Sequence, residues 1–403
     1  MILMSPHQVL FAFAAVAAVL ALGGALYVVL LALVGLLAKP AARSDRTEAV
    51  PRTRFVMLIP AHNEEEGISA TLESIRLQKY AATLLRVIVI ADNCSDQTAA
   101  VVRAHGFECW ERVAPTARGK GPALRWALDQ LANAPFDAAV FIDADTRVDP
   151  EFLPAMDRGI QQGAVALQGR YEFDVADSSY FSLISFASKR SENSLFWRPR
   201  QLFGWAGFIV GNGFCLRRET IQSVPWDAYS IVEDVEYSIQ LALQGLQVRY
   251  LEAALVTSRP TRRVADAAPQ RLRWASGTFQ VILRYAPKLL RASIVQRSFL
   301  LAEMALALTL TSRFLVLYLL LAASGASLAL GVSGSAFYLR AAVIASFLLL
   351  AIYTAMVFSQ IPKKYGSPLK SLAALPFYVC WMLFVHMAAA VGLRRNSWVR
   401  TAR

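Results

Sequence analysis

Two aspartates with one small residue between them, Asp143 and Asp145, directly follow an apolar run over residues 138–142. If that run is a buried strand, both carboxylates emerge from its end near one point, where they suit a hard divalent cation and phosphate oxygens. The alternative is a simple turn in which aspartate caps the backbone. The sequence has no Walker-type glycine loop and no GxGxxG after a strand, which argues against P-loop and dinucleotide enzymes. The pair therefore predicts a nucleotide site of another kind.

Polar residues also follow two earlier apolar runs, over residues 55–59 and 86–91. Strands alternating with helical patterns indicate a mainly parallel α/β sheet, which binds ligands beyond the carboxyl ends of its strands. Asp92 can accept hydrogen bonds from a base or ribose, or can cap the next helix. The expected helices cover residues 65–77, 95–104 and 120–131. The remaining nucleotide-binding candidates follow the first run and are Pro60, Ala61, Asn63 and Glu64, with His62 among them.

Charged residues in two later segments have the chemistry that such a site needs. In the segment Arg118-Gly119-Lys120-Gly121, Lys120 can clamp a diphosphate from a flexible loop, although a solvated loop is the alternative. Glu233 and Asp234 begin an amphipathic helical pattern, where acidic residues are favourable at the amino terminus of the helix. A general base needs a carboxylate near the acceptor hydroxyl, and this pair is the best remaining candidate.

The segment Gln270-Arg271-Leu272-Arg273-Trp274 lies on an expected helix that leads towards an apolar region. Taken alone, it favours a basic interfacial helix with a tryptophan at the depth of the lipid headgroups. A catalytic role depends on the other clusters. No metal-ligand spacing links the histidines, and the four cysteines lack a CxxC pair, as expected in a reducing compartment.

The composition predicts a membrane protein. Of the 403 residues, 56% are hydrophobic and only 17% are charged, which is unlike soluble domains. Uncharged runs over 9–38, 314–339, 341–362 and 371–393 are each long enough to cross a bilayer. Residues 299–312 form a shorter run, which we expect to be an interfacial helix or an extension of the next crossing. The net charge of +12 is best explained by cytoplasmic topology signals and contact with anionic membrane lipids, not nucleic acid.

Basic residues place the expected crossings relative to the cytoplasm. Positive residues between 39 and 54 follow the first run, so the amino terminus is predicted outside. Lys363 and Lys364 then fall inside, but three carboxy-terminal crossings leave the basic tail, residues 394–403, outside. A re-entrant last segment would return the tail to the cytoplasm. The predicted division is 1–50 for a membrane helix and linker, 51–297 for a cytoplasmic domain and 298–403 for a membrane domain.

In order and spacing, the polar clusters resemble those of membrane-bound family 2 glycosyltransferases, which include cellulose, chitin and hyaluronan synthases and bacterial exopolysaccharide enzymes. Residues 60–64 match the PxxNE motif, and Asp92 matches the first aspartate. The resemblance also includes the DxD, ED and QxxRW motifs, at Asp143 and Asp145, at Asp234, and at Gln270, Arg273 and Trp274. Val232 departs from the threonine that many members have before ED.

The resemblance implies a GT-A fold flanked by transmembrane helices, a UDP-sugar donor, Mg²⁺ or Mn²⁺, and inversion at the anomeric carbon. It implies that Asp234 is the base and that a metal at Asp145 and Asp143 stabilises the leaving diphosphate. Arg273 and Lys120 would assist, and Trp274 would floor the acceptor site. The other motif residues would bind the donor. Gly211-Asn212-Gly213 resembles a loop near the acceptor.

The acceptor stays open between a growing polysaccharide and a membrane lipid. A non-processive lipid glycosyltransferase carries the same motifs, and about four crossings would leave a polymer channel to an oligomer or an export partner. A non-catalytic membrane scaffold is a further alternative. The expected location is a bacterial-type inner membrane, with several crossings and the catalytic domain in the cytoplasm.

Overall fold

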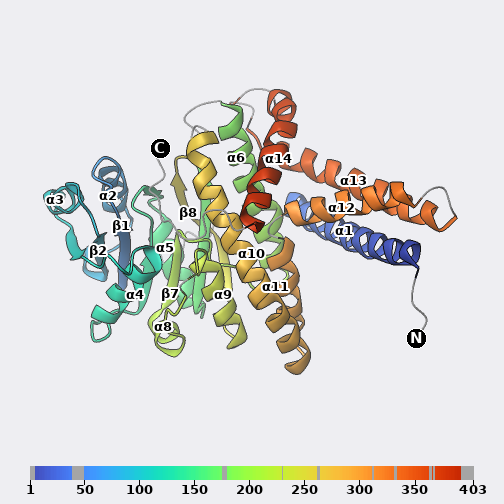
Figure 1. Cartoon of the computed structure of the whole chain (residues 1–403). Helices are drawn as coiled ribbons and strands as arrows, with labels where there is room; N and C mark the ends of the chain where they lie inside the picture. The colour runs from blue at the N-terminus through green and yellow to red at the C-terminus, as the bar shows by residue number, and fades with distance from the viewer. Residues whose placement is uncertain are drawn as a thin grey trace.

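The computed structural model consists of a mixed sheet domain and a group of long apolar helices (Figure 1). The structure describes residues 5–38, 50–174, 179–228, 230–260, 264–310, 313–330, 334–362, 365 and 368–391. The strands are β1 Phe55–Ala61, β2 Leu85–Asp92, β3 Glu108–Arg112, β4 Ala138–Phe141, β5 Thr146–Val148, β6 Ala166–Phe173, β7 Phe214–Arg217 and β8 Val248–Ser258. Across these residues they form one sheet in the order β3-β2-β1-β4-β7-β6-β8-β5.

The predicted parallel core of the sheet is confirmed. Strand β1 pairs in parallel with β2 and β4, and β2 pairs in parallel with β3, whereas β7 is antiparallel to both of its neighbours. In this register Ala61 lies opposite Ala91, and Asp92 lies opposite Arg112. The carboxyl ends of these strands therefore share one edge, where the polar clusters follow.

Helices cover both faces of the sheet, which explains why β1 is apolar along its whole length. Met57 and Ile59 pack on the face covered by α2 (Ile68–Arg76), α3 (Thr98–Ala104) and α5 (Phe152–Gln161). Val56 and Leu58 point to the other face, which α4 (Lys120–Gln130) and α9 (Glu233–Leu243) cover. Two short helices flank strands of the sheet: η1 (Ala82–Leu84) directly precedes β2, and α8 (Arg218–Ser223) directly follows β7.

The predicted starts of two helices were wrong. Helix α2 begins at Ile68 and α3 at Thr98, each three residues later than expected. The reason is that polar residues bond across the two loops. The Asp96 carboxylate accepts from the backbone N of Glu65 at 3.1 Å and from that of Thr98 at 3.0 Å, so side chains replace a first helical turn.

Three apolar helices form a bundle that projects from the sheet domain (Figure 1). They are α1 (Pro6–Leu37), α12 (Arg313–Ala329) and α13 (Gly334–Phe358). Helix α1 contacts the other two mainly through buried alanines, because small side chains let helices approach closely. Helix α13 begins before Arg340, so the expected boundary at 341 was wrong. Arg340 lies in the second turn of α13 and donates to the carbonyl of Ser327, near the end of α12, at 3.3 Å.

A second layer of helices lies between the sheet and this bundle (Figure 1). It contains α6 (Tyr180–Ser191), the π-helix η2 (Glu192–Trp197), α7 (Arg198–Leu202), α10 (Val264–Val295), α11 (Phe299–Leu310) and α14 (Pro368–Ala390). In the described residues, α1, α13 and α14 are each long and apolar enough to cross a membrane. Helix α12 joins them as a fourth if it forms one span with α11, bent by 73°.

Candidate active site at the carboxyl edge of the sheet

The PxxNE segment ties together the loops that follow β1 and β2. Asn63 has a φ of 55°, a left-handed conformation that asparagine tolerates, and its Oδ1 accepts from the backbone N of Ser95 at 2.8 Å. The backbone N of Glu64 donates to Thr98 Oγ1 at 2.8 Å. The first two residues of the segment end β1 and are Pro60 and Ala61. The segment therefore fixes two strand ends relative to each other.

Asp92 is buried at the end of β2 and is held by an arginine. Its Oδ1 accepts from Arg112 Nη1 at 2.5 Å and from Asn93 Nδ2 at 2.9 Å. Its backbone carbonyl is 2.7 Å from His62 Nδ1. Helix α3 begins six residues later without a side-chain cap, so the alternative role of Asp92 as a helix cap was wrong. A contact of Asp92 with the nucleotide stays a prediction.

Lys120 joins three segments that are distant in sequence. It is the first residue of α4, not part of a flexible loop as expected. Its Nζ donates to Asp143 Oδ1, just after β4, and to the carbonyl oxygen of Gly211. Gly119 precedes it with a φ of 116°, which favours glycine and lets α4 begin at this point. The predicted lysine clamp thus lies directly beside the DxD motif.

The Gly211-Asn212-Gly213 loop supports the DxD motif from the opposite side. Asn212 is buried, and its Oδ1 accepts from the backbone N of Asp143 at 3.1 Å. Its Nδ2 donates to Thr146 Oγ1 at 2.7 Å, and its carbonyl accepts from Gln168 Nε2 at 2.8 Å. These bonds fix the turn that carries Asp143 and Asp145.

Glu233 and Asp234 complete this group at the amino terminus of α9. Both side chains keep partial exposure to solvent. A Cβ added to Gly211 would lie 3.0 Å from Asp234 Oδ2 and 4.0 Å from Lys120 Nζ, so the three residues meet at one point. Asp234 Oδ1 also accepts from the backbone N of Val235 at 2.8 Å. We call Lys120, Asp143, Glu233 and Asp234 the acidic cluster.

The charges of the acidic cluster shift the protonation of its members. Burial and the neighbouring charge of Asp234 raise the pKa of Glu233 to about 7. Burial also raises the pKa of Asp234. Burial lowers the pKa of Lys120, but Asp143 and the two α9 carboxylates outweigh it, so the pKa lies above its usual value. A carboxylate that has a raised pKa and lies beside a positively charged side chain is typical of a general acid or base.

Helix α10 brings the QxxRW residues to the side of the sheet domain where the acidic cluster lies. Burial lowers the pKa of Arg273, while the charge of Glu233 opposes this, which places Arg273 near the acidic cluster. Gly277 allows this approach, because a Cβ there would lie 3.1 Å from Val232 Cγ1. Gln270 is half-buried, and Trp274 is 37% exposed with Arg271 stacked 5.3 Å from its ring centre.

The donor atoms at the DxD motif fit a divalent cation that arrives with a diphosphate. Asp143 and Asp145 offer carboxylate oxygens at the turn after β4, and the Asp143 side chain is 36% exposed. In the described part of the chain, no group of three or more His, Cys, Asp or Glu side chains could hold a metal ion. Phosphate oxygens and water would therefore supply the other ligands.

Sequence analysis missed two residues that shape the site and understated a third. Arg112 ends β3 opposite Asp92, and Gln168 supports the 211–213 loop from β6. Asn212 was noted only as part of a loop near the acceptor. The signal for Arg112 is its place at the end of a strand, but its partner becomes evident only from the register of β2 and β3.

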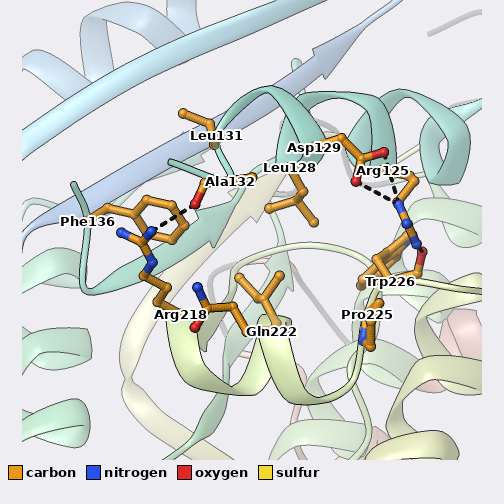
Figure 2. A pocket seen from close by; sticks show the side chains of 11 residues that line it. Arg125, Leu128, Asp129, Leu131, Ala132, Phe136, Arg218, Gln222, Pro225 and Trp226 are labelled. Carbon is orange, nitrogen blue, oxygen red and sulfur yellow. Dashed lines mark hydrogen bonds and ion pairs between the residues drawn. The ribbon is translucent and has the colours of Figure 1, made fainter. Parts of the chain in front are cut away.

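A shallow cavity of about 210 Å³ lies away from this site, between the carboxy-terminal half of α4 and α8 (Figure 2). Figure 2 shows Arg125 bonded to Asp129 on one side and Arg218 beside Phe136 on the other. None of the predicted site residues lines it, so it is separate from the carboxyl edge of the sheet.

The family described as glycosyl transferase family group 2 matches residues 139–392, which is more than half of the chain. The chain belongs to this family. The match includes the DxD, ED and QxxRW motifs and the apolar helices that follow. It therefore confirms the resemblance drawn from the polar clusters.

Two relatives agree with this assignment. The chain is 28% identical to a probable glycosyltransferase YdaM of Bacillus subtilis over 57% of its length and 56% of that protein. It is 27% identical to a poly-β-1,6-N-acetyl-D-glucosamine synthase of Staphylococcus epidermidis over 56% of its length and 55% of the synthase. The matches thus span little more than half of each relative.

The fold also matches that of a solved glycosyltransferase. A mannosyltransferase from Pyrobaculum calidifontis, solved with GDP-mannose and Mn²⁺, superposes with a TM-score of 0.58 and 20% identity. The superposition covers 95% of this chain and 98% of the mannosyltransferase. This likeness confirms the GT-A fold.

Proposed function

We propose that this protein transfers a sugar, with inversion, from a UDP-sugar to a growing polysaccharide or another membrane-associated acceptor. The observation that carries the proposal is the acidic cluster, where Lys120, Asp143 and Asp234 converge on Gly211 beside Arg273. The relatedness to a poly-β-1,6-N-acetyl-D-glucosamine synthase supports a polysaccharide acceptor.

The proposed reaction is a single displacement at the anomeric carbon. The Asp234 carboxylate takes the proton of the acceptor hydroxyl while that oxygen forms its bond to the anomeric carbon. The bond between this carbon and the diphosphate oxygen breaks at the same time, and UDP leaves with the electron pair. Arg273 and Lys120 are proposed to stabilise the negative charge on the leaving diphosphate, and their positions near Glu233 and Asp143 support this.

The proposed cofactor is Mg²⁺ or Mn²⁺ at Asp145 and Asp143. When bound, the ion would neutralise part of the charge on the diphosphate. Asp143 already pairs with Lys120, so we expect Asp145 to be the principal protein ligand. Asn63, Glu64, Asp92 and Gln270 are proposed to bind the rest of the donor, and Trp274 to contact the acceptor.

We also propose a location that follows from the charges along the chain. Residues 51–297 would lie in the cytoplasm, between a membrane helix in residues 1–50 and a membrane region in 298–403. The inner membrane of a bacterial-type cell fits this arrangement, with membrane lipids as direct partners. The basic residues between 39 and 54 support the cytoplasmic side for the sheet domain.

A membrane lipid is the second candidate acceptor. The observation in its favour is the direct packing of α1 on α12 and α13, in which Ala14, Ala17 and Ala21 of α1 are almost fully buried. In the described parts of α1, α12 and α13, packing this close leaves no room for a polymer between the helices. A polysaccharide would then need an oligomer or an export partner, whereas a glycosylated lipid would not.

A donor screen tests the proposal. Membranes containing the protein would receive radiolabelled UDP-sugars, with GDP-mannose as a comparison, and Asp234→Asn membranes as the matched control. We expect transfer from one UDP-sugar only in the presence of Mg²⁺ or Mn²⁺, with long products for a polymer synthase and single additions for a lipid enzyme. Absence of transfer from every donor would favour a non-catalytic scaffold.

A further inference from the structure

Helix α14 does not join the bundle formed by α1, α12 and α13. Its extensive contacts are with α10 and α6, in the layer beside the sheet domain (Figure 1). On α10 it packs through Val385 and Ala389 against Ala275, close to the QxxRW segment. A fourth member of a membrane bundle would instead pack along its neighbouring spans.

Both ends of α14 contact the same end of the bundle. Near its start, Leu372 and Leu375 share a hydrophobic cluster with Phe358, the last residue of α13. Near its end, the His386 ring lies 4.8 Å from that of Phe314 and 6.0 Å from that of Tyr318, in the first turns of α12. The end of α13 and the start of α12 lie on the same side of the membrane, because the two helices are consecutive crossings.

If α14 crossed the bilayer, His386 would have different neighbours. About 14 residues separate Leu372 from His386, or about 21 Å of helix. If α14 ran through the bilayer, this rise would bring His386 towards the opposite ends of α12 and α13. It meets the start of α12 instead. Helix α14 therefore runs across the ends of these two helices rather than beside them.

The outward side of α14 is apolar. Phe377, Cys380, Phe384, Met387 and Val391 are exposed and recur every three or four residues, which places them on one stripe. An exposed stripe of this size on a protein with membrane spans fits lipid.

The outward side of the neighbouring helix α10 combines apolar and basic residues. Leu283, Leu290 and Ile294 are exposed, and Lys288 and Arg291 lie among them. A basic and apolar mixture of this kind is typical of a helix at the surface of an anionic membrane. Helices α10 and α14 thus each have an outward side that suits contact with lipid.

The charges of the chain agree with this placement. With crossings by α1, α12 and α13 only, the basic residues between 39 and 54, Lys363 and Lys364, and the arginines of the tail all fall on the cytoplasmic side. A fourth crossing by α14 would put Arg394, Arg395, Arg400 and Arg403 outside.

We propose that α14 lies in the cytoplasmic surface of the membrane, with its apolar stripe in the lipid, and that the chain crosses the membrane three times. The proposal rests on the cytoplasmic location of the sheet domain but not on sugar transfer. It places a lipid-embedded wall beside Arg271 and Trp274, where an acceptor held in the membrane would reach the site.

Depth measurement at Cys380 tests the proposal, because this residue lies near the middle of α14. The full-length protein would carry a spin label at Cys380 in vesicles with anionic lipid, with Cys94 and Cys109 replaced by serine and the buried Cys215 retained. We expect a shallow label, about 5–10 Å below the headgroups. The matched control is a label at Leu348→Cys with Cys380 also replaced by serine; Leu348 is 60% exposed near the middle of α13 and should report the bilayer centre.

A reporter active only in the cytoplasm, fused after Arg403, provides the second measurement. Activity there and a shallow Cys380 label support the proposal. A silent reporter, or a Cys380 label as deep as that of the α13 control, would overturn it. Both measurements are independent of transfer, so the donor screen can fail without affecting this result.

Discussion

Two ionic clusters in this protein use similar side chains in opposite ways. The acidic cluster sets one lysine against the carboxylates of Asp143, Glu233 and Asp234, all of them partly open to solvent. The second cluster, which we call the membrane-side clamp, joins α1, α7 and α11 through Tyr27, Arg200 and Glu303. Arg200 and Glu303 pair with side chains that are 1% and 2% exposed.

The difference lies in charge balance. In the membrane-side clamp, one cation meets one anion. Tyr27 OH donates to Glu303 at 2.6 Å, and Arg200 also donates to the carbonyl of Ala206 at 2.6 Å. In the acidic cluster, carboxylates outnumber the lysine, so a cation or a cationic transition state can still be accommodated. Buried ion pairs with equal numbers of opposite charges hold elements together. Solvent-accessible clusters with an excess of carboxylates are available for catalysis.

Asp234→Asn should produce the largest loss of activity. Asp234 lies inside α9, and asparagine keeps an oxygen that can accept from the backbone N of Val235. Asparagine cannot accept the acceptor's proton, so turnover should fall by roughly 10² to 10⁴. Donor affinity should stay nearly constant, which steady-state kinetics would detect as a fall in kcat without a rise in KM.

The matched control for Asp234→Asn is Glu233→Gln, which removes the neighbouring carboxylate and should be milder. If the Asp234→Asn enzyme kept more than about a tenth of its turnover, less than 1.4 kcal/mol of transition-state stabilisation would be lost. Asp234 would then not be the base, and Glu233 would replace it as the candidate.

Glu303→Gln should affect stability and leave the chemistry intact. Removing the anion leaves the Arg200 charge buried without a counter-ion, which typically costs about 3–5 kcal/mol. Thermal unfolding in detergent would measure the loss. The double variant Arg200→Met with Glu303→Leu should recover most of the stability, and equal stability of all three proteins would show that the clamp holds nothing together.

The pH dependence of turnover should depend on Glu233. A base must be deprotonated, so turnover should rise with pH as Asp234, with its raised pKa, ionises. Burial and the charge of the ionised Asp234 raise the pKa of Glu233 to about 7, so Glu233 is still neutral while Asp234 ionises. Glu233→Gln should therefore leave the acidic limb in place but remove the change in turnover that accompanies the ionisation of Glu233 near pH 7. A limb that moved in Glu233→Gln would show that Glu233 is charged before Asp234 ionises.

Gly211→Ala should give the smallest effect. Gly211 has a φ of 82°, and an added Cβ would lie 3.0 Å from Asp234 Oδ2. The backbone strain is about 1–2 kcal/mol, and the contact should also lower turnover by displacing the base. Gly204→Ala is the matched control, because Gly204 has a φ of 69° and a Cβ there would meet nothing within 4 Å. Equal turnover of both variants would exclude a positional role for Gly211.

Local sequence patterns predicted the parallel core of the sheet and the positions of its polar clusters. Strands β1, β2 and β4 are short apolar runs with Asn, Asp or Glu at or just after their ends, and such patterns depend only on neighbouring residues. Partners across the sheet could not be predicted in this way. The contact of Lys120 with Asp143 depends on where α4 begins relative to β4, and that of Asp92 with Arg112 depends on strand register.

The membrane side was the least predictable region. Its apolar runs are long enough to cross a bilayer, but length does not say what a helix packs against. Helix α14 is as apolar as a crossing helix, and only its contacts with α6 and α10 place it beside the sheet domain. Arg200 and Glu303 are 103 residues apart, so their pairing leaves no local signal.

Calorimetric titration with UDP and Mn²⁺ compares the two clusters most directly. Wild type, Asp145→Ala and Glu303→Gln would be titrated as folded proteins in detergent, each with and without the ion. We expect Asp145→Ala to lose the ion-dependent part of UDP affinity, because the ion's charge is the largest local term in such a site. Glu303→Gln should keep that part. Unchanged affinity in Asp145→Ala, or an equal loss in both variants, would contradict a metal and donor site at the carboxyl edge of the sheet.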